Sequence, residues 1–297
     1  MNYSFNNNVL RITLDSNYDG KPLSSFFETY SISKKYRHLY TQNKNILVNQ
    51  EPIHSSSYTL HANDLLEIMV PEEEIDYPCA DEQCEVVYED EFVYVAHKPA
   101  GLIIHGEELC FVNYAATFQK EHHIHAPIRY IHRLDKETTG LVLFVKIPFL
   151  QSYYDQLLAN RFIHRSYLAI TSGTKPKHSS FTINNPIGKD RHHNGKYRVS
   201  STGKEAQTHV QWLDEKKGFL LFRCELETGR THQIRVHLSH RGYPIINDDL
   251  YGLRNKTFAH MCLWANQIVF PHPFIEKTII VKDTFNNDYQ LFKEIIE

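Results

Sequence analysis

Residues 129–146 read RYIHRLDKETTGLVLFVK, and the composition of the chain changes sharply within this stretch. A polar cluster that includes Asp135 ends at Gly140, and the apolar run 141–145 follows immediately. This pattern predicts a charged loop directly before a buried strand, where side chains can be displayed rigidly at a cleft. A single Asp in such a loop is more often part of a surface turn, so the pattern alone does not assign it a function.

The length and composition indicate a globular protein. With 297 residues, 41% hydrophobic and 12% aromatic, the chain can form a sizeable core and two domains. It has no apolar run long enough to span a membrane and no secretory signal, so we expect a cytoplasmic protein without a membrane partner, and a monomer. Its five cysteines lack CxxC spacing and are expected to be reduced: Cys79, Cys84, Cys110, Cys224 and Cys262.

Charge is distributed unevenly along the chain. The net charge is −3, but residues 71–92 contain ten acids and no Lys or Arg. The remainder, 93–297, has 26 basic and 19 acidic residues. Because phosphate contacts depend on local Lys and Arg, this distribution permits a nucleic-acid partner without demanding one.

Residues 1–70 are predicted to form a small module. Helical periodicity is visible at 23–30 and 34–40, and short strands are expected at 46–48 and 65–69. The acidic, Pro-containing stretch 71–91 is expected to be an extended linker. It precedes a strand at 92–96 and a turn in which we interpret Lys98 and Gly101 as turn residues.

Residues 92–297 are predicted to form an α+β domain with a mixed, largely antiparallel sheet. A helix is expected at 148–160, and strands at 167–170, 206–213 and 219–227. A further helix is expected in 230–240, with Ile234 and Leu238 facing the core and Gly242 at its C-cap.

Three motifs resemble those of the RluA-type RNA pseudouridine synthases. Residues 132–140, HRLDKETTG, resemble the HRLDxxTSG motif of that family, and residues 226–238, LETGRTHQIRVHL, match a second motif. Residues 242–252, GYPIINDDLYG, resemble a third, with Asn247 in place of a usual glycine. Asn is the least costly substitute if that position needs a positive φ. The 1–70 module resembles a diverged S4 RNA-binding domain, and whether it binds RNA stays open.

The resemblance implies three catalytic residues. Asp135 matches the catalytic Asp, as either a nucleophile at C1′ of the ribose or a base at C2′. A carboxylate among apolar groups needs a cation to stay ionised, and Arg235 matches the family's arginine partner. Tyr167 matches the active-site tyrosine, whose ring could stack on an extruded uracil.

The resemblance also implies residues that contact RNA. Arg133 matches the arginine that fills the gap left by the flipped nucleotide. Arg165 stands where the family often has Lys, and Arg230 lies in the second motif. His132 beside Arg133 is expected to stabilise the motif through hydrogen bonds rather than act as a general base.

Two other functions were weighed. The 19 histidines suggest a metal enzyme, but no HExxH or matching acid or cysteine spacing accompanies them. An inactive RNA-binding protein of the same fold is the stronger alternative, although Asp135, Tyr167 and Arg235 are all present. We therefore expect a cofactor-free and metal-free RNA pseudouridine synthase, with ribosomal RNA favoured over transfer RNA as its substrate.

Overall fold

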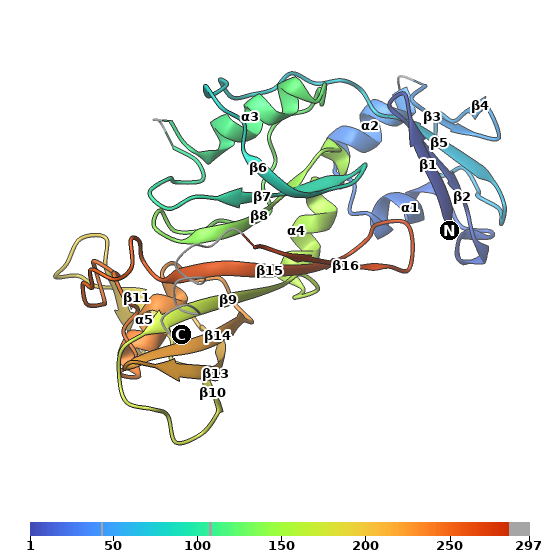
Figure 1. The fold of residues 1–297 in the computed structure, drawn as a ribbon. Coiled ribbons are helices and arrows are strands. Elements are labelled where there is room, and N and C mark those ends of the chain that lie inside the picture. The colour runs from blue at the N-terminus through green and yellow to red at the C-terminus, as the bar shows by residue number, and fades with distance from the viewer. Residues whose placement is uncertain (43, 107–108, 285–297) are drawn as a thin grey trace.

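The structure, a computed structural model, describes residues 1–42, 44–106 and 109–284 (Figure 1). Its N-terminal part is a five-stranded sheet in the order β1-β2-β5-β3-β4. The strands and helices of this part are β1 (Asn2–Asn6), β2 (Val9–Thr13), η1 (Ser16–Tyr18), α1 (Leu23–Thr29), α2 (Lys34–Gln42), β3 (Ile46–Val48), β4 (Glu51–Pro52) and β5 (Leu65–Met69). Both predicted helices and both predicted strands are present. The sequence analysis missed β1, β2 and β4.

A second, larger sheet carries the rest of the fold. Its strands follow the order β10-β13-β14-β9-β15-β8-β7-β6, with β16 paired to β15. Among the described residues, β8 and β15 are the only parallel pair in this sheet, and the other strand pairs are antiparallel. The predicted mixed, largely antiparallel architecture is therefore confirmed. The elements are β6 (Glu85–Glu89), β7 (Val93–Lys98), α3 (Phe111–Glu121), β8 (Thr139–Val145), η2 (Pro148–Leu150), α4 (Gln151–Ala159), β9 (His164–Thr171), β10 (Ser180–Ile183), β13 (Thr208–Lys216), β14 (Phe219–Leu226), α5 (Gln233–His240), β15 (Leu263–Pro271) and β16 (Thr278–Lys282); β11 (Ile187–Lys189) and β12 (Tyr197–Val199) form a separate hairpin.

Strand β8 is buried along its whole length because both faces of the sheet are covered. Val142 and Phe144 point into a core that includes the apolar face of α3. Leu141, Leu143 and Val145 point into a second core on the opposite face. The alternation follows from the two-residue period of a strand, and it explains the continuous apolar run seen in the sequence.

The second core joins the N-terminal module to the large sheet. It contains residues of α1 and of the small sheet together with residues of β7, β8, η2 and α4. Tyr30 packs against Phe274 at 4.9 Å between ring centroids and donates its hydroxyl to the Pro273 carbonyl at 3.1 Å. Tyr40 meets the edge of Phe149 at 5.7 Å. These contacts hold the module against the large sheet, and Figure 1 shows the two parts side by side.

The acidic stretch 71–91 is tied to the fold more closely than an extended linker would be. Strand β6 lies within it and pairs with β7 at the sheet edge. Asp76 accepts a hydrogen bond from the Ile128 amide and forms an ion pair with Arg129 at 2.7 Å. The sequence analysis missed β6 because its acids masked a short strand pattern. The division into 1–70, 71–91 and 92–297 remains a proposal, and 285–297 lie outside the described residues.

Gly140 sits where β8 meets β15 in parallel, and its φ is +111°. A Cβ at this position would lie 2.3 Å from the Ala265 carbonyl oxygen, a rigid backbone atom. Gly218 also has a positive φ, +82°, but no atom lies within 4 Å of its Cβ position.

We predict that Gly140→Ala lowers the free energy of unfolding by about 3 kcal/mol, because both strain and a backbone clash oppose it. The matched variant Gly218→Ala should lose only about 1 kcal/mol, because it carries the strain alone. Urea unfolding of both variants measures the difference. Equal losses would show that the close approach of β8 and β15 imposes no constraint.

Candidate active site

One cleft of about 880 Å³ is lined by all seven residues predicted from the sequence. It lies between the loop that precedes β8, the start of β9 and the segment that leads into α5. The sequence places these elements far apart, and the sheet brings them together because β9 pairs with both β14 and β15. The seven residues are His132, Arg133, Asp135, Arg165, Tyr167, Arg230 and Arg235.

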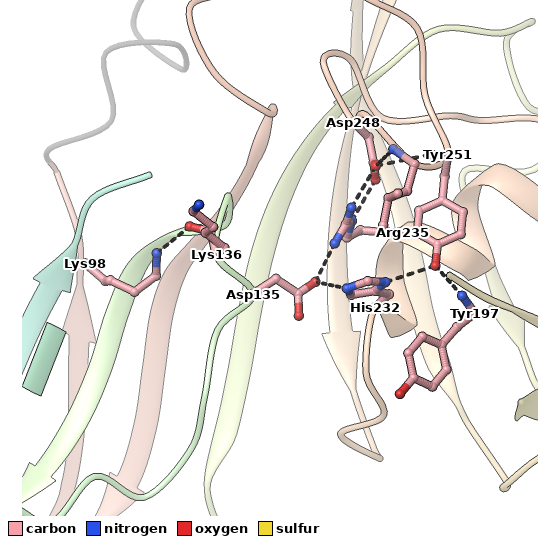
Figure 2. A network of polar contacts seen from close by, with 9 residues as sticks. Lys98, Asp135, Lys136, Tyr197, His232, Arg235, Asp248 and Tyr251 are labelled. Carbon is pink, nitrogen blue, oxygen red and sulfur yellow. Dashed lines mark hydrogen bonds and ion pairs between the residues drawn. The ribbon is translucent and has the colours of Figure 1, made fainter. Parts of the chain in front are cut away.

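Arg235 connects two carboxylates at the base of this cleft (Figure 2). Its Nη1 donates to Asp135 Oδ2 at 3.0 Å, and its Nε and Nη2 donate to the two oxygens of Asp248 at 2.8 Å each. The Arg235 side chain is 6% exposed and that of Asp248 is fully buried, whereas Asp135 is 25% exposed. Asp248 and Asp135 raise the pKa of Arg235 against the effect of burial, so the guanidinium stays charged. Asp135 therefore has a fixed cation on one side and the cleft on the other.

A buried lysine holds the loop that carries Asp135. Lys98 is fully buried, and its Nζ donates to the carbonyls of Pro99, Leu102 and Lys136 at 2.6, 2.8 and 3.0 Å. Burial lowers the pKa of Lys98 to about 7, while nearby carboxylates, including Asp135, oppose that shift. The sequence analysis interpreted Lys98 as a turn residue only. In the structure, Lys98 also ties the turn after β7 to the loop before β8.

Helix α5 begins at Gln233, later than the expected range 230–240 suggests, because His232 before it is left-handed with φ 57°. Gln233 accepts from the Arg230 amide and donates to the Thr208 hydroxyl, which fastens the first turn of the helix to the start of β13. Ile234 faces the core as predicted. This start places Arg235 in the first turn, directed at Asp135.

Tyr167 lies in β9 and lines the same cleft, and it is 4% exposed. Burial raises the pKa of the Tyr167 phenol, and the neighbouring Arg165 partly opposes the shift, so the hydroxyl is protonated at neutral pH.

His132 also lines the cleft and is buried. Burial lowers the pKa of His132 to about 3, and the charge of Arg165 adds to that shift, so His132 is neutral. Neither ring nitrogen of His132 has a hydrogen-bond partner among the described residues. His132 therefore does not make the motif-stabilising hydrogen bonds expected from the sequence.

The mouth of the cleft is basic. Arg133 and Arg230 are exposed, and Arg161 lines the same edge. Arg230 is oriented by a hydrogen bond from its Nε to the Glu205 carbonyl at 2.7 Å, and Arg161 pairs with Glu227 at 3.2 Å. Guanidinium groups at a cleft mouth suit phosphate contacts.

The third motif supplies parts of the site that the sequence analysis did not assign. Asp248, in this motif, anchors Arg235. The residue before it, Asn247, has a φ of 58°, which confirms that this position needs left-handed backbone. Tyr251 lies over the Arg235 guanidinium at 5.2 Å. A bidentate partner for a buried arginine could have been sought among the acids of this motif.

Among the described residues, no cluster of three or more His, Cys, Asp or Glu side chains could hold a metal ion. No helix in the described part of the chain is long and apolar enough to cross a membrane.

Comparison with known proteins identifies the family of this chain. The family described as RNA pseudouridylate synthase matches residues 92–240, and the N-terminal domain of the RluD ribosomal pseudouridine synthase matches residues 10–66. The chain belongs to the RNA pseudouridine synthase family. It is thus an enzyme that isomerises uridine to pseudouridine in RNA.

Relatives of this synthase match over most of its length. The Bacillus subtilis (strain 168) RNA pseudouridine synthase YhcT is 32% identical over 287 residues, or 94% of each chain. The ribosomal large subunit pseudouridine synthase D of Xylella fastidiosa (strain Temecula1) is 36% identical over 69% of this chain and 67% of its own. The structure of human RNA Pseudouridylate Synthase Domain Containing 4 has a TM-score of 0.60 and 25% identity, covering 71% of this chain and 92% of the human one.

We predict that Asp248→Asn lowers the free energy of unfolding by about 3 kcal/mol and lowers kcat at least tenfold, because it leaves the buried Arg235 with one carboxylate. The neighbouring Asp249 pairs with Arg254, and both side chains are more than half exposed. Asp249→Asn should therefore change stability by less than about 0.5 kcal/mol. Thermal unfolding and a pseudouridine assay on both variants provide the measurement. Wild-type activity in Asp248→Asn would contradict the anchoring role.

Proposed function

We propose that this synthase modifies uridines of ribosomal RNA, with Asp135 as the catalytic residue. The observation that supports the catalytic assignment is the 3.0 Å contact between Asp135 and Arg235 inside a cleft also lined by Tyr167. The ribosomal substrate is supported by the names of relatives such as the Xylella fastidiosa enzyme, and by the match of residues 10–66 to the RluD N-terminal domain.

The reaction breaks the bond between N1 of uracil and C1′ of the ribose, rotates the base and joins C5 to C1′. The proton on C5 is lost, and N1 gains a proton in the product. Asp135 can act as the nucleophile at C1′ or as the base at C2′, and both roles require the ionised carboxylate that Arg235 stabilises.

We assign Tyr167 to the base and the arginines to the RNA backbone. The Tyr167 ring can stack on the extruded uracil, with its protonated hydroxyl on the side of the cleft where C5 loses a proton. Arg133 is exposed at the mouth, where its planar group can occupy the gap left by the flipped nucleotide. Arg165 and Arg230 line the same cleft and suit phosphate contacts.

His132 suits a contact with the bound nucleotide better than one with phosphate. It is neutral, and its buried ring nitrogens find no hydrogen-bond partner among the described residues. The presence of Asp135, Arg235 and Tyr167 together in one cleft favours an active enzyme over an inactive RNA-binding protein of the same fold. A monomeric state and a cytoplasmic location stay predictions.

Loss of this protein should remove pseudouridine from one or a few positions of ribosomal RNA and leave transfer RNA unchanged, because the substrate is ribosomal. Chemical mapping of pseudouridine in total RNA from deletion and complemented strains measures this. The sites should return with the wild-type gene. Loss confined to transfer RNA would contradict the ribosomal substrate, and an unchanged map would contradict the function.

A further inference from the structure

His232 occupies a place in the cleft to which the proposed function gives no role. It lies directly before α5 in left-handed backbone, a conformation uncommon for residues other than glycine. Figure 2 shows its ring between the Asp135 carboxylate and the Tyr251 hydroxyl. Its Nε2 is 3.9 Å from Asp135 Oδ2, and its Nδ1 is 2.9 Å from the Tyr251 oxygen.

The contacts of Tyr251 favour one position for the proton of the neutral His232 ring. The Tyr251 oxygen accepts a hydrogen bond from the Tyr197 amide at 2.7 Å. Its own proton is then free to be donated to Nδ1 of His232, so that the Tyr251 proton and Nδ1 both have a partner. A neutral imidazole that accepts at Nδ1 carries its proton on Nε2, the nitrogen that faces Asp135.

Both groups that approach Asp135 do so at the same oxygen. Arg235 donates to Oδ2, and Nε2 of His232 faces Oδ2 as well. Oδ1 has no hydrogen-bond partner or ion-pair contact among the described residues. The separation of 3.9 Å is longer than a hydrogen bond, and such contacts commonly shorten when substrate binds.

We propose that His232 is a positioning residue for Asp135: as a neutral imidazole held by Tyr251, it directs its Nε2–H at Oδ2 and leaves Oδ1 as the oxygen that reacts. This inference rests on the proposed role of Asp135. It assigns to His232 and Tyr251 the orientation of the carboxylate, in addition to the charge that Arg235 supplies.

The charges around His232 favour its neutral form. Burial lowers the pKa of His232 first, and Arg235 lowers it further, while Asp135 and Asp248 oppose the shift. Among the described residues, the phenols of Tyr197 and Tyr251 also face the ring, with ring centroids at 5.5 and 5.7 Å. At low pH a proton on Nδ1 would displace the hydrogen bond from Tyr251, so activity should fall as His232 becomes charged.

Two substitutions separate positioning from a structural role. His232→Gln keeps one donor and one acceptor at similar reach but cannot become charged near neutral pH. His232→Asn tolerates the left-handed backbone but is too short to reach Asp135. We expect His232→Asn to lower kcat at least about tenfold with KM for RNA unchanged, as for loss of a hydrogen bond to a charged group. His232→Gln should stay within about threefold of the wild type, and its activity should persist to lower pH.

A spectroscopic measurement on the free protein tests the arrangement without substrate. In ¹⁵N-histidine NMR spectra, the His232 signal should show the Nε2–H tautomer at pH 7 and change in Tyr251→Phe. The exposed His240 provides the control variant, His240→Gln, which should leave kcat and the His232 signal unchanged.

An Nδ1–H tautomer or a charged His232 at pH 7 would overturn the proposal, as would wild-type kcat in His232→Asn. Failure of the wild-type enzyme to form pseudouridine would instead count against the proposed function, and the NMR result would still decide how His232 is protonated.

Discussion

The charge of Arg235 is the constraint on which the site depends. A guanidinium that is only 6% exposed must be neutralised and fully hydrogen-bonded, or its desolvation would cost several kcal/mol. Asp248 meets this need with two parallel hydrogen bonds and is itself fully buried. The third nitrogen, Nη1, is then left to face the cleft, where it binds Asp135. Asp248 thus fixes the position of Arg235, and Arg235 fixes that of the carboxylate.

This arrangement requires a scaffold that places distant segments within 3 Å of each other. The loop before β8 and the start of α5 come from opposite halves of the large sheet, and they meet because β15 pairs with β8 on one side and β9 on the other. Cores on both faces of the sheet make these strands rigid. Lys98 then ties the Asp135 loop to the end of β7. Pre-organisation of this kind lets the site stabilise charge without rearranging during the reaction.

Local patterns were sufficient to predict much of this molecule. The buried strand after Gly140, the helices of the N-terminal module and the positive φ of Asn247 follow from composition and backbone preferences. Motif resemblance supplied the Asp135–Arg235 pair. Asp248 and Tyr251 were missed because their roles depend on contacts between segments that no spacing encodes. The acids of β6 hid a strand because a sheet edge tolerates charges that a core strand would exclude.

The most direct test of the central claim compares wild type with Asp135→Asn, which preserves the shape of the side chain and removes its charge. We predict that this variant binds target RNA with nearly wild-type affinity and forms no detectable pseudouridine in single-turnover assays at saturating enzyme. Asp155→Asn, a substitution of another carboxylate that lines the cleft, should retain activity. Pseudouridine formation by Asp135→Asn at the wild-type rate would contradict the assignment of Asp135 as the catalytic residue.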